Sequence, residues 1–206
     1  MRRLCSIALL LCLSACGMAE DEREEDKRRE YISLPDPAFE AYCLETYDLN
    51  GDGRLSRYEA ERVLYIDCSG RGIESLYGIA NFTALRELDC ADNRIPSLEL
   101  DRLDRLESLD CSGNGLRSLA VGKLRALWRL DCADNLLAEL DLQSCVSLSW
   151  LDCSNNDLHI LDVANCARPM TYLNAAGNAS LTLLYKSVNQ PIDRLHLDGQ
   201  VRIEER

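Results

Sequence analysis

The stretch that decides the fold is residues 106–147, which reads LESLDCSGNGLRSLAVGKLRA followed by LWRLDCADNLLAELDLQSCVS. Laid one above the other, the two 21-residue lines share four leucines, one cysteine and one asparagine at equivalent positions. Self-similarity at a fixed period of this length is typical of solenoids, in which each repeat is one structural unit stacked on the next. We therefore begin from the repeat and work outward.

The same unit occurs four times in close copy, beginning at Leu85, Leu106, Leu127 and Leu148. Within each copy a cysteine follows five residues after the first leucine, and an asparagine three residues later: Cys90, Cys111, Cys132 and Cys153, then Asn93, Asn114, Asn135 and Asn156. The flanking units are degenerate, as terminal repeats often are. A first unit starts at Val63 and has Arg71 in the asparagine position, and a last strand is expected between Ile192 and Leu197. The repeat domain is thus predicted to cover residues 63–206.

Alternation within the unit predicts a short β-strand. In Leu88-Asp89-Cys90 the leucine and the cysteine face the core and the aspartate faces outward, because successive side chains of a strand point to opposite sides. The asparagine should turn inward at the bend after the strand, where its amide can satisfy backbone groups of neighbouring rungs. The fold class predicted is an α/β-type leucine-rich-repeat solenoid of short parallel strands.

The pattern L-x-x-L-x-L-x-x-N-x-L, with cysteine at its third apolar place, is that of leucine-rich repeats. The short period and the Leu-Asp-Cys-Ser type of strand resemble the internalin-like repeats of bacterial surface proteins over residues 63 to about 200. We therefore expect a binding module that holds a protein or peptide ligand on its concave strand face.

Residues 33–62 are predicted to form a helical N-terminal cap around an EF-hand-like calcium loop, Asp48 to Glu59. The loop has oxygen donors at the spacing of an EF-hand and Gly53 at its sharp turn. The expected Ca²⁺ ligands are Asp48, Asn50, Asp52, the backbone carbonyl of Arg54, Ser56 and Glu59. The alternative is a turn rich in Asp and Gly that binds no metal. A helix from Asp36-Pro37 to about Tyr47 and an exit helix to about Arg62 should flank the loop. The combination resembles a class of bacterial leucine-rich-repeat lipoproteins with a single EF-hand-type loop.

The N-terminus carries an export signal. Basic Arg2 and Arg3 precede a short apolar run that ends in Leu13-Ser14-Ala15-Cys16, which resembles the lipobox of bacterial lipoproteins. Residues 1–15 are then a signal peptide, Cys16 is the lipidated residue, and residues 16–32 are an acidic, flexible tether. The expected location is the bacterial cell envelope, at the surface of the outer membrane. An ordinary secretory signal with an incidental cysteine is the alternative.

Eleven cysteines in an exported chain raise the question of disulfides. The repeated cysteines occupy one inward column, where a small apolar side chain fits, so core packing is the preferred interpretation. Cys145 and Cys166 share a second column and are the one pair for which a bridge stays open.

The net charge of −12 disfavours nucleic acid and favours basic partners. One outward row is acidic, with Asp89, Asp110, Asp131 and Asp152, and the neighbouring row places Arg129, Trp150 and Tyr172 side by side as a candidate ligand site. A glycan-binding accessory lipoprotein that stacks sugars on these aromatics is the alternative function. The chain has two histidines and no nucleophile at motif spacing, so no enzyme is predicted.

Overall fold

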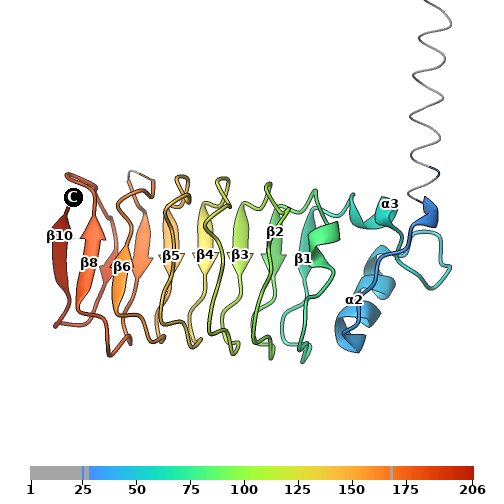
Figure 1. The fold of residues 1–206 in the computed structure, drawn as a ribbon, viewed down its shortest axis with the longest axis horizontal. Helices are drawn as coiled ribbons and strands as arrows, with labels where there is room; N and C mark the ends of the chain where they lie inside the picture. Colours follow the sequence, from blue (N-terminus) through green and yellow to red (C-terminus); the bar gives the residue numbers. More distant parts are fainter. Residues whose placement is uncertain (1–24, 26–27, 168) are drawn as a thin grey trace, which may run out of the picture.

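The computed structural model describes residue 25 and residues 28–206 except residue 168, and its rungs follow one another in a nearly straight row (Figure 1). Two helices, α2 (Pro37–Tyr47) and α3 (Arg57–Ala60), precede the stack at its N-terminal end. The predicted signal peptide and Cys16 lie outside the described residues. No helix in the described part of the chain is long and apolar enough to cross a membrane.

The first sheet contains one short strand from each rung, about seven turns in all. Its strands, all parallel and in chain order, are β1 (Tyr65–Asp67), β2 (Glu87–Asp89), β3 (Ser108–Asp110), β4 (Arg129–Asp131), β5 (Trp150–Asp152), β7 (Tyr172–Asn174) and β9 (Leu195–His196). The register aligns equivalent positions, so Leu88, Leu109, Leu130 and Leu151 form one buried column. The predicted strands and their parallel stacking are confirmed.

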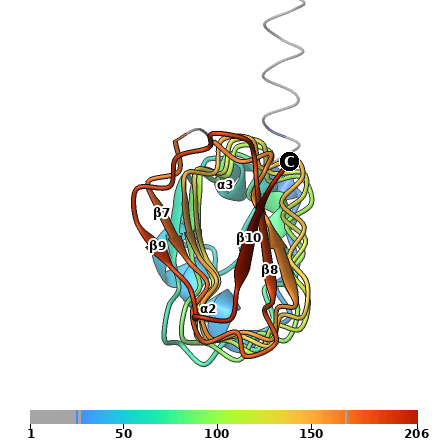
Figure 2. The same ribbon diagram turned by 90° about the vertical axis from the view of Figure 1, so that its left-hand side faces the viewer.

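A second sheet, not predicted from the sequence, forms the opposite wall of the solenoid (Figure 2). It joins β6 (Ile160–Asp162), β8 (Leu183–Lys186) and β10 (Arg202–Glu205), again in parallel. In earlier rungs this wall has a single bridge between Leu98 and Leu119 and the 3₁₀ turn η1 (Ile79–Asn81). The predicted α/β-type fold class is therefore wrong for this wall, which consists of strands and turns instead of helices. A 21-residue rung leaves too few residues for a return helix, so the repeats form a parallel β-solenoid with few helices.

The core contains buried columns of leucine and of cysteine. Cys90, Cys111, Cys132 and Cys153 are fully buried, and all eight cysteines of the described residues are free thiols, including Cys145 and Cys166. Burial raises the pKa of the Cys145 thiol to about 11 and that of Cys166 to about 12. A thiol that stays protonated is a poor nucleophile, so these side chains act as small apolar residues.

The asparagines turn inward, as predicted, and join neighbouring rungs. The side-chain amide of Asn135 donates to the carbonyls of Cys111, Cys132 and Ala133 at 3.0–3.2 Å, and its oxygen accepts from the N–H of Leu116 at 3.0 Å. One side chain therefore satisfies backbone groups in two successive rungs, which no apolar residue in this position can do.

The N-terminal cap follows its sequence signals closely. Asp36 caps α2 by accepting from the N–H groups of Ala38 and Phe39, and its other oxygen accepts from Glu74 and Ser75 of the first rung. Burial disfavours the charge of Asp36, but these four backbone N–H groups lower its pKa. Phe39 packs fully buried against Phe82, with ring centroids 6.2 Å apart. The helix and the first rung are thus one packed unit.

The exit helix is shorter than expected. Ser56 and Glu59 form the predicted capping box, but α3 is a single turn that ends at Ala60 instead of continuing to about Arg62. The N–H groups of Arg62 and Val63 donate to the carbonyls three residues before them. The chain therefore makes a tighter, 3₁₀-type turn before the first strand begins.

Candidate functional site

The outer surface of the first sheet, which we call the strand face, is the face expected to bind ligand. Each of β1 to β5 ends in an aspartate on this face. One oxygen of each carboxylate accepts from the backbone N–H two residues later; for Asp110 this is the N–H of Ser112 at 3.1 Å, with the serine hydroxyl at 2.7 Å. This turn-capping role of the aspartates was not predicted from the sequence, although the repeated Asp-Cys-Ser and Asp-Cys-Ala triplets have the spacing of such side-chain-capped turns.

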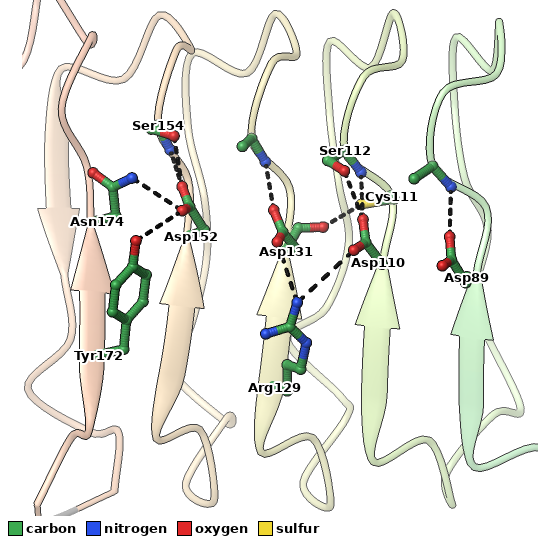
Figure 3. A network of polar contacts seen from close by, with 12 residues as sticks. Asp89, Asp110, Cys111, Ser112, Arg129, Asp131, Asp152, Ser154, Tyr172 and Asn174 are labelled. Carbon is green, nitrogen blue, oxygen red and sulfur yellow. Dashed lines mark hydrogen bonds and ion pairs between the residues drawn. The ribbon is translucent and has the colours of Figure 1, made fainter. Parts of the chain in front are cut away.

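The second carboxylate oxygen of Asp110, Asp131 and Asp152 is directed toward side chains of the strand face (Figure 3). Arg129 lies between two of them, with its Nη2 3.3 Å from Asp131 and 3.9 Å from Asp110. Burial and the negative charge of Asp110 raise the pKa of Asp131 to about 6, although Arg129 acts in the opposite direction. Around β3 and β4, the negative charge of Asp110 and Asp131 therefore exceeds the single positive charge of Arg129.

The three residues predicted for ligand binding are brought together by the sheet register, which places Arg129 beside Trp150 and Trp150 beside Tyr172. The Arg129 guanidinium lies 3.6 Å from the centre of the Trp150 ring. The Tyr172 ring stacks on Trp150 with centroids 4.8 Å apart and planes 13° from parallel. Since β4 and β7 flank β5, the two neighbours cover opposite faces of the indole.

The stack is also fixed from the side. The Tyr172 hydroxyl donates to Asp152 at 3.2 Å, and the Asn174 amide donates to the same carboxylate oxygen at 3.0 Å (Figure 3). Burial, together with the negative charge of Asp152, raises the pKa of the Tyr172 phenol. The aromatic residues are half-buried, not freely exposed as the sequence suggested. They present ring edges on a rigid support, which reduces the entropy lost when a ligand binds.

The predicted calcium loop is folded around its own side chains. Asp48 accepts from the N–H groups of Gly51 and Gly53, both at 2.8 Å, and Asp52 accepts from the N–H of Arg54 at 2.9 Å. Gly51 and Gly53 have φ angles of 70° and 76°, a conformation that side chains disfavour. The loop is thus compact and rich in turns, a backbone common to a calcium loop and to the metal-free turn rich in Asp and Gly.

The donor set of this loop fits calcium in kind, since every predicted ligand offers oxygen. Glu59, however, is used by the protein itself: its carboxylate accepts from the Ser56 N–H and hydroxyl at 2.9 and 2.6 Å, and from the Leu49 N–H at 2.9 Å. Across the described residues no three His, Cys, Asp or Glu side chains converge closely enough to hold a metal. Bidentate binding by Glu59 would require its carboxylate to exchange the Ser56 hydroxyl for the ion.

Comparison with known proteins places the fold. No protein-family model and no curated protein matches the chain. Among solved structures, the functional domain of InlJ from Listeria monocytogenes is similar at 27% identity and a TM-score of 0.62, over 78% of this chain and 37% of that one. An internalin from the same species, InlF, has 16% identity and a TM-score of 0.53, over 84% and 72% of the two chains. The leucine-rich-repeat domain of APL1B has 19% identity and a TM-score of 0.50, over 94% and 60%.

The molecule is therefore a leucine-rich-repeat solenoid of internalin-like fold, the class of fold that suggests a protein-interaction module. The chain spans little more than a third of the InlJ chain. The InlJ domain is described as including a cysteine ladder, and here Cys68, Cys90, Cys111, Cys132 and Cys153 form a comparable buried column. None of the three neighbours is described as an enzyme.

Proposed function

We propose that this chain is a cell-envelope leucine-rich-repeat lipoprotein that binds an extended, basic protein or peptide segment on its strand face. The observation that carries the proposal is the row Arg129–Trp150–Tyr172, stacked and fixed beside a row of aspartates. The internalin-like fold supports a protein partner, because leucine-rich-repeat domains generally bind proteins.

Charge on the strand face favours a basic ligand. On β1 to β5 and β7 the two outward rows contain five aspartates and Glu87, and Arg129 is their one cation. Because Asp131 is already disfavoured as an anion by burial and by Asp110, a lysine or arginine placed over Asp110 and Asp131 would gain by relieving that repulsion. Positive ligand charge also speeds encounter with such a surface.

The aromatic residues support a protein ligand better than a stacked sugar. Trp, Tyr and Arg are the residue types that dominate binding energy at protein interfaces, especially where their conformations are fixed in advance. A sugar that stacks on an aromatic residue needs an open ring face, and both faces of Trp150 are covered by Arg129 and Tyr172. The alternative of a glycan-binding lipoprotein therefore lacks its expected platform at Trp150.

A mixed array of short peptides and glycans, probed with the wild-type protein and two tryptophan variants, tests this proposal. We expect the wild type to retain lysine- and arginine-rich peptides and Trp150→Ala to lose at least tenfold in affinity for them, as truncation of a hot-spot residue does. Trp128→Ala is the matched control, because Trp128 is 45% exposed but outside the row. Retention of glycans that depends on Trp150 would instead support the alternative.

We further propose that the loop Asp48–Glu59 binds Ca²⁺ and stabilises the N-terminal cap. Asp48, Asn50, Asp52, Ser56, Glu59 and the carbonyl of Arg54 would supply the oxygens. A bound cation would neutralise the carboxylates of Asp48 and Asp52, which accept from donors of the loop and, in the case of Asp52, also from the Tyr31 hydroxyl. Since α2 and the first rung pack as one unit through Asp36 and Phe39, stabilisation of the loop should reach the whole repeat stack.

Thermal unfolding with calcium and with chelator tests the metal proposal. Calcium at a hundredfold excess over its dissociation constant should stabilise the wild type by about 2.7 kcal/mol, and Glu59→Gln should lose most of that increase. Glu139→Gln is the control, because Glu139 is exposed and lies on a distant rung. An unchanged melting temperature for the wild type in millimolar calcium would mean that the loop is a metal-free turn.

The location of the protein is proposed from its N-terminal sequence. The Leu-Ser-Ala-Cys segment supports lipidation at Cys16, and the acidic residues that follow support display at the outer-membrane surface. In that arrangement the membrane is contacted through the lipid anchor only, and the strand face is presented to partners.

A further inference from the structure

The segment Glu30–Ile32 lies against the proposed calcium loop. Tyr31 forms an antiparallel bridge with Ser56. The Ile32 N–H donates to the Leu55 carbonyl at 2.9 Å, and the Arg57 N–H donates to the Glu30 carbonyl at 2.7 Å. The sequence predicted that these residues end the tether; in the structure they form an isolated antiparallel bridge with the second half of the loop.

Side chains fasten the same segment to the loop at three further points. The Tyr31 hydroxyl donates to Oδ2 of Asp52 at 3.1 Å, and the guanidinium of Arg54 lies 4.0 Å from the centre of the Tyr31 ring. Glu30 forms an ion pair with Arg57 at 2.9 Å. The hydrogen bond to Asp52, with the negative charge of that carboxylate, raises the pKa of the Tyr31 phenol, as expected of a donor bound to an anion.

We propose that Tyr31 is a positioning residue for calcium binding, which holds the Asp52 carboxylate in place from outside the loop, and that calcium binding and docking of Glu30–Ile32 stabilise each other. This inference rests on the proposed function of the loop as a calcium site. It assigns a role to a residue seventeen positions before the loop begins, which no loop motif includes.

The physical reason is the state of the Asp52 carboxylate. Its Oδ1 accepts from the Arg54 N–H, and its Oδ2 accepts from Tyr31 and from the Asn50 amide at 3.1 Å. Hydrogen bonds from outside a metal site fix the orientation of ligating carboxylates, and loss of such a partner commonly weakens metal affinity about 10- to 100-fold. Without the Tyr31 hydroxyl, Asp52 is oriented only by donors within an exposed loop.

Coupling must act in both directions. If docking of Glu30–Ile32 raises the calcium affinity, then calcium raises the stability of the docked segment by the same factor. The amides that report this docking are those of Ile32 and Arg57, because each donates across the bridge.

Calorimetric titration of the mature chain with calcium, combined with amide exchange at Ile32 and Arg57, tests the inference. Tyr31→Phe removes the hydroxyl and keeps the ring that Arg54 covers, so the segment can still pack. We expect a calcium affinity about tenfold lower for Tyr31→Phe than for the wild type. Tyr77→Phe, which removes a hydroxyl from a 66% exposed ring of the first rung, should bind as the wild type does. Calcium should slow exchange of both amides in the wild type.

The outcomes separate the two proposals. Calcium heat in the wild type with an unchanged affinity in Tyr31→Phe, or with no slowing of exchange at Ile32 and Arg57, overturns the role of Tyr31 and leaves the calcium loop standing. No calcium heat in any variant overturns both proposals. Reduced affinity in Tyr31→Phe alone, with calcium-dependent protection in the wild type, supports the inference.

Discussion

Replacement of Asn135 by alanine tests how the rungs are held together. In the structure the three carbonyls that accept from the Asn135 amide each have another donor: Asn114 for Cys111, Asn156 for Cys132 and Gly113 for Ala133. The N–H of Leu116, in contrast, bonds to the Asn135 oxygen, and Leu116 is fully buried. The variant therefore leaves one buried donor unsatisfied and weakens three carbonyl contacts.

The expected loss of stability follows from this difference between the Leu116 N–H, which loses its acceptor, and the three carbonyls, which each keep a second donor. An unsatisfied buried N–H costs about 1–3 kcal/mol, and each hydrogen bond lost from a carbonyl that keeps a second donor costs about 0.5 kcal/mol. The expected loss in the free energy of unfolding is therefore about 2.5–4.5 kcal/mol. For a chain of this size, about 1 kcal/mol corresponds to a shift of roughly 2–4 °C, so the melting temperature should fall by about 5–18 °C.

Thermal melts followed by far-ultraviolet circular dichroism measure this loss directly. Asn165→Ala is the matched control, because Asn165 is exposed, and its melting temperature should change by no more than about 1–2 °C. A fall of less than 2 °C in Asn135→Ala would refute the account, since the inward asparagines would then contribute little to the stacking of rungs.

Three further predictions follow from single cysteine and aspartate positions. Cys16→Ser should release the protein from the membrane fraction or leave it unprocessed, as seen by fractionation and intact mass. Cys111 should resist alkylation until the protein is denatured, since burial raises its pKa, and Cys111→Ala should cost about 1 kcal/mol or more in urea melts. Because the pKa of Asp131 is raised to about 6 from 3.8, the folded state retains this proton longer than the unfolded chain; stability should fall as pH rises from about 4 to 6, and Asp131→Asn should flatten that dependence.

The repeat itself could be predicted from the sequence because its signal is redundant. Four copies agree on the leucine, cysteine and asparagine columns, and one strand per rung in parallel register is the arrangement that buries all three. The helical cap was also predictable, since Asp36-Pro37 and the Ser56–Glu59 pair are local signals read within one turn of helix. Such features depend on neighbours in sequence or on the fixed period.

The second sheet and the turn-capping role of the aspartates were not predicted, for different reasons. Strands β8 and β10 arise in the degenerate last rungs, where the period no longer helps, and β6, in the last regular rung, is only three residues long. The aspartates did carry a signal, the serine or alanine two residues on, but an acidic outward row is also what solubility alone would give. Only hydrogen-bond geometry distinguishes the two.

At the candidate sites the sequence predicted proximity but not contact. The register was sufficient to place Arg129, Trp150 and Tyr172 in one row, but not to show that Arg129 and Tyr172 cover both faces of the indole. Likewise, the expected calcium ligands lie close together in the sequence and could be identified from it. The bridge between Tyr31 and Ser56 depends on the path of the chain before the cap, which the sequence does not show. Tertiary packing decides both.

Site-specific photocrosslinking in the native cell envelope tests the central claim most directly. A benzophenone side chain at Ser108, beside Arg129 in the register, is on the strand face, whereas one at exposed Ser118, next to the Leu98–Leu119 bridge, is on the opposite wall. We predict a protein adduct from position 108 that disappears when Trp150→Ala is added, and no such adduct from position 118. Equal adducts from both positions, or an adduct from position 108 that persists in Trp150→Ala, would contradict binding at the Arg129–Trp150–Tyr172 row.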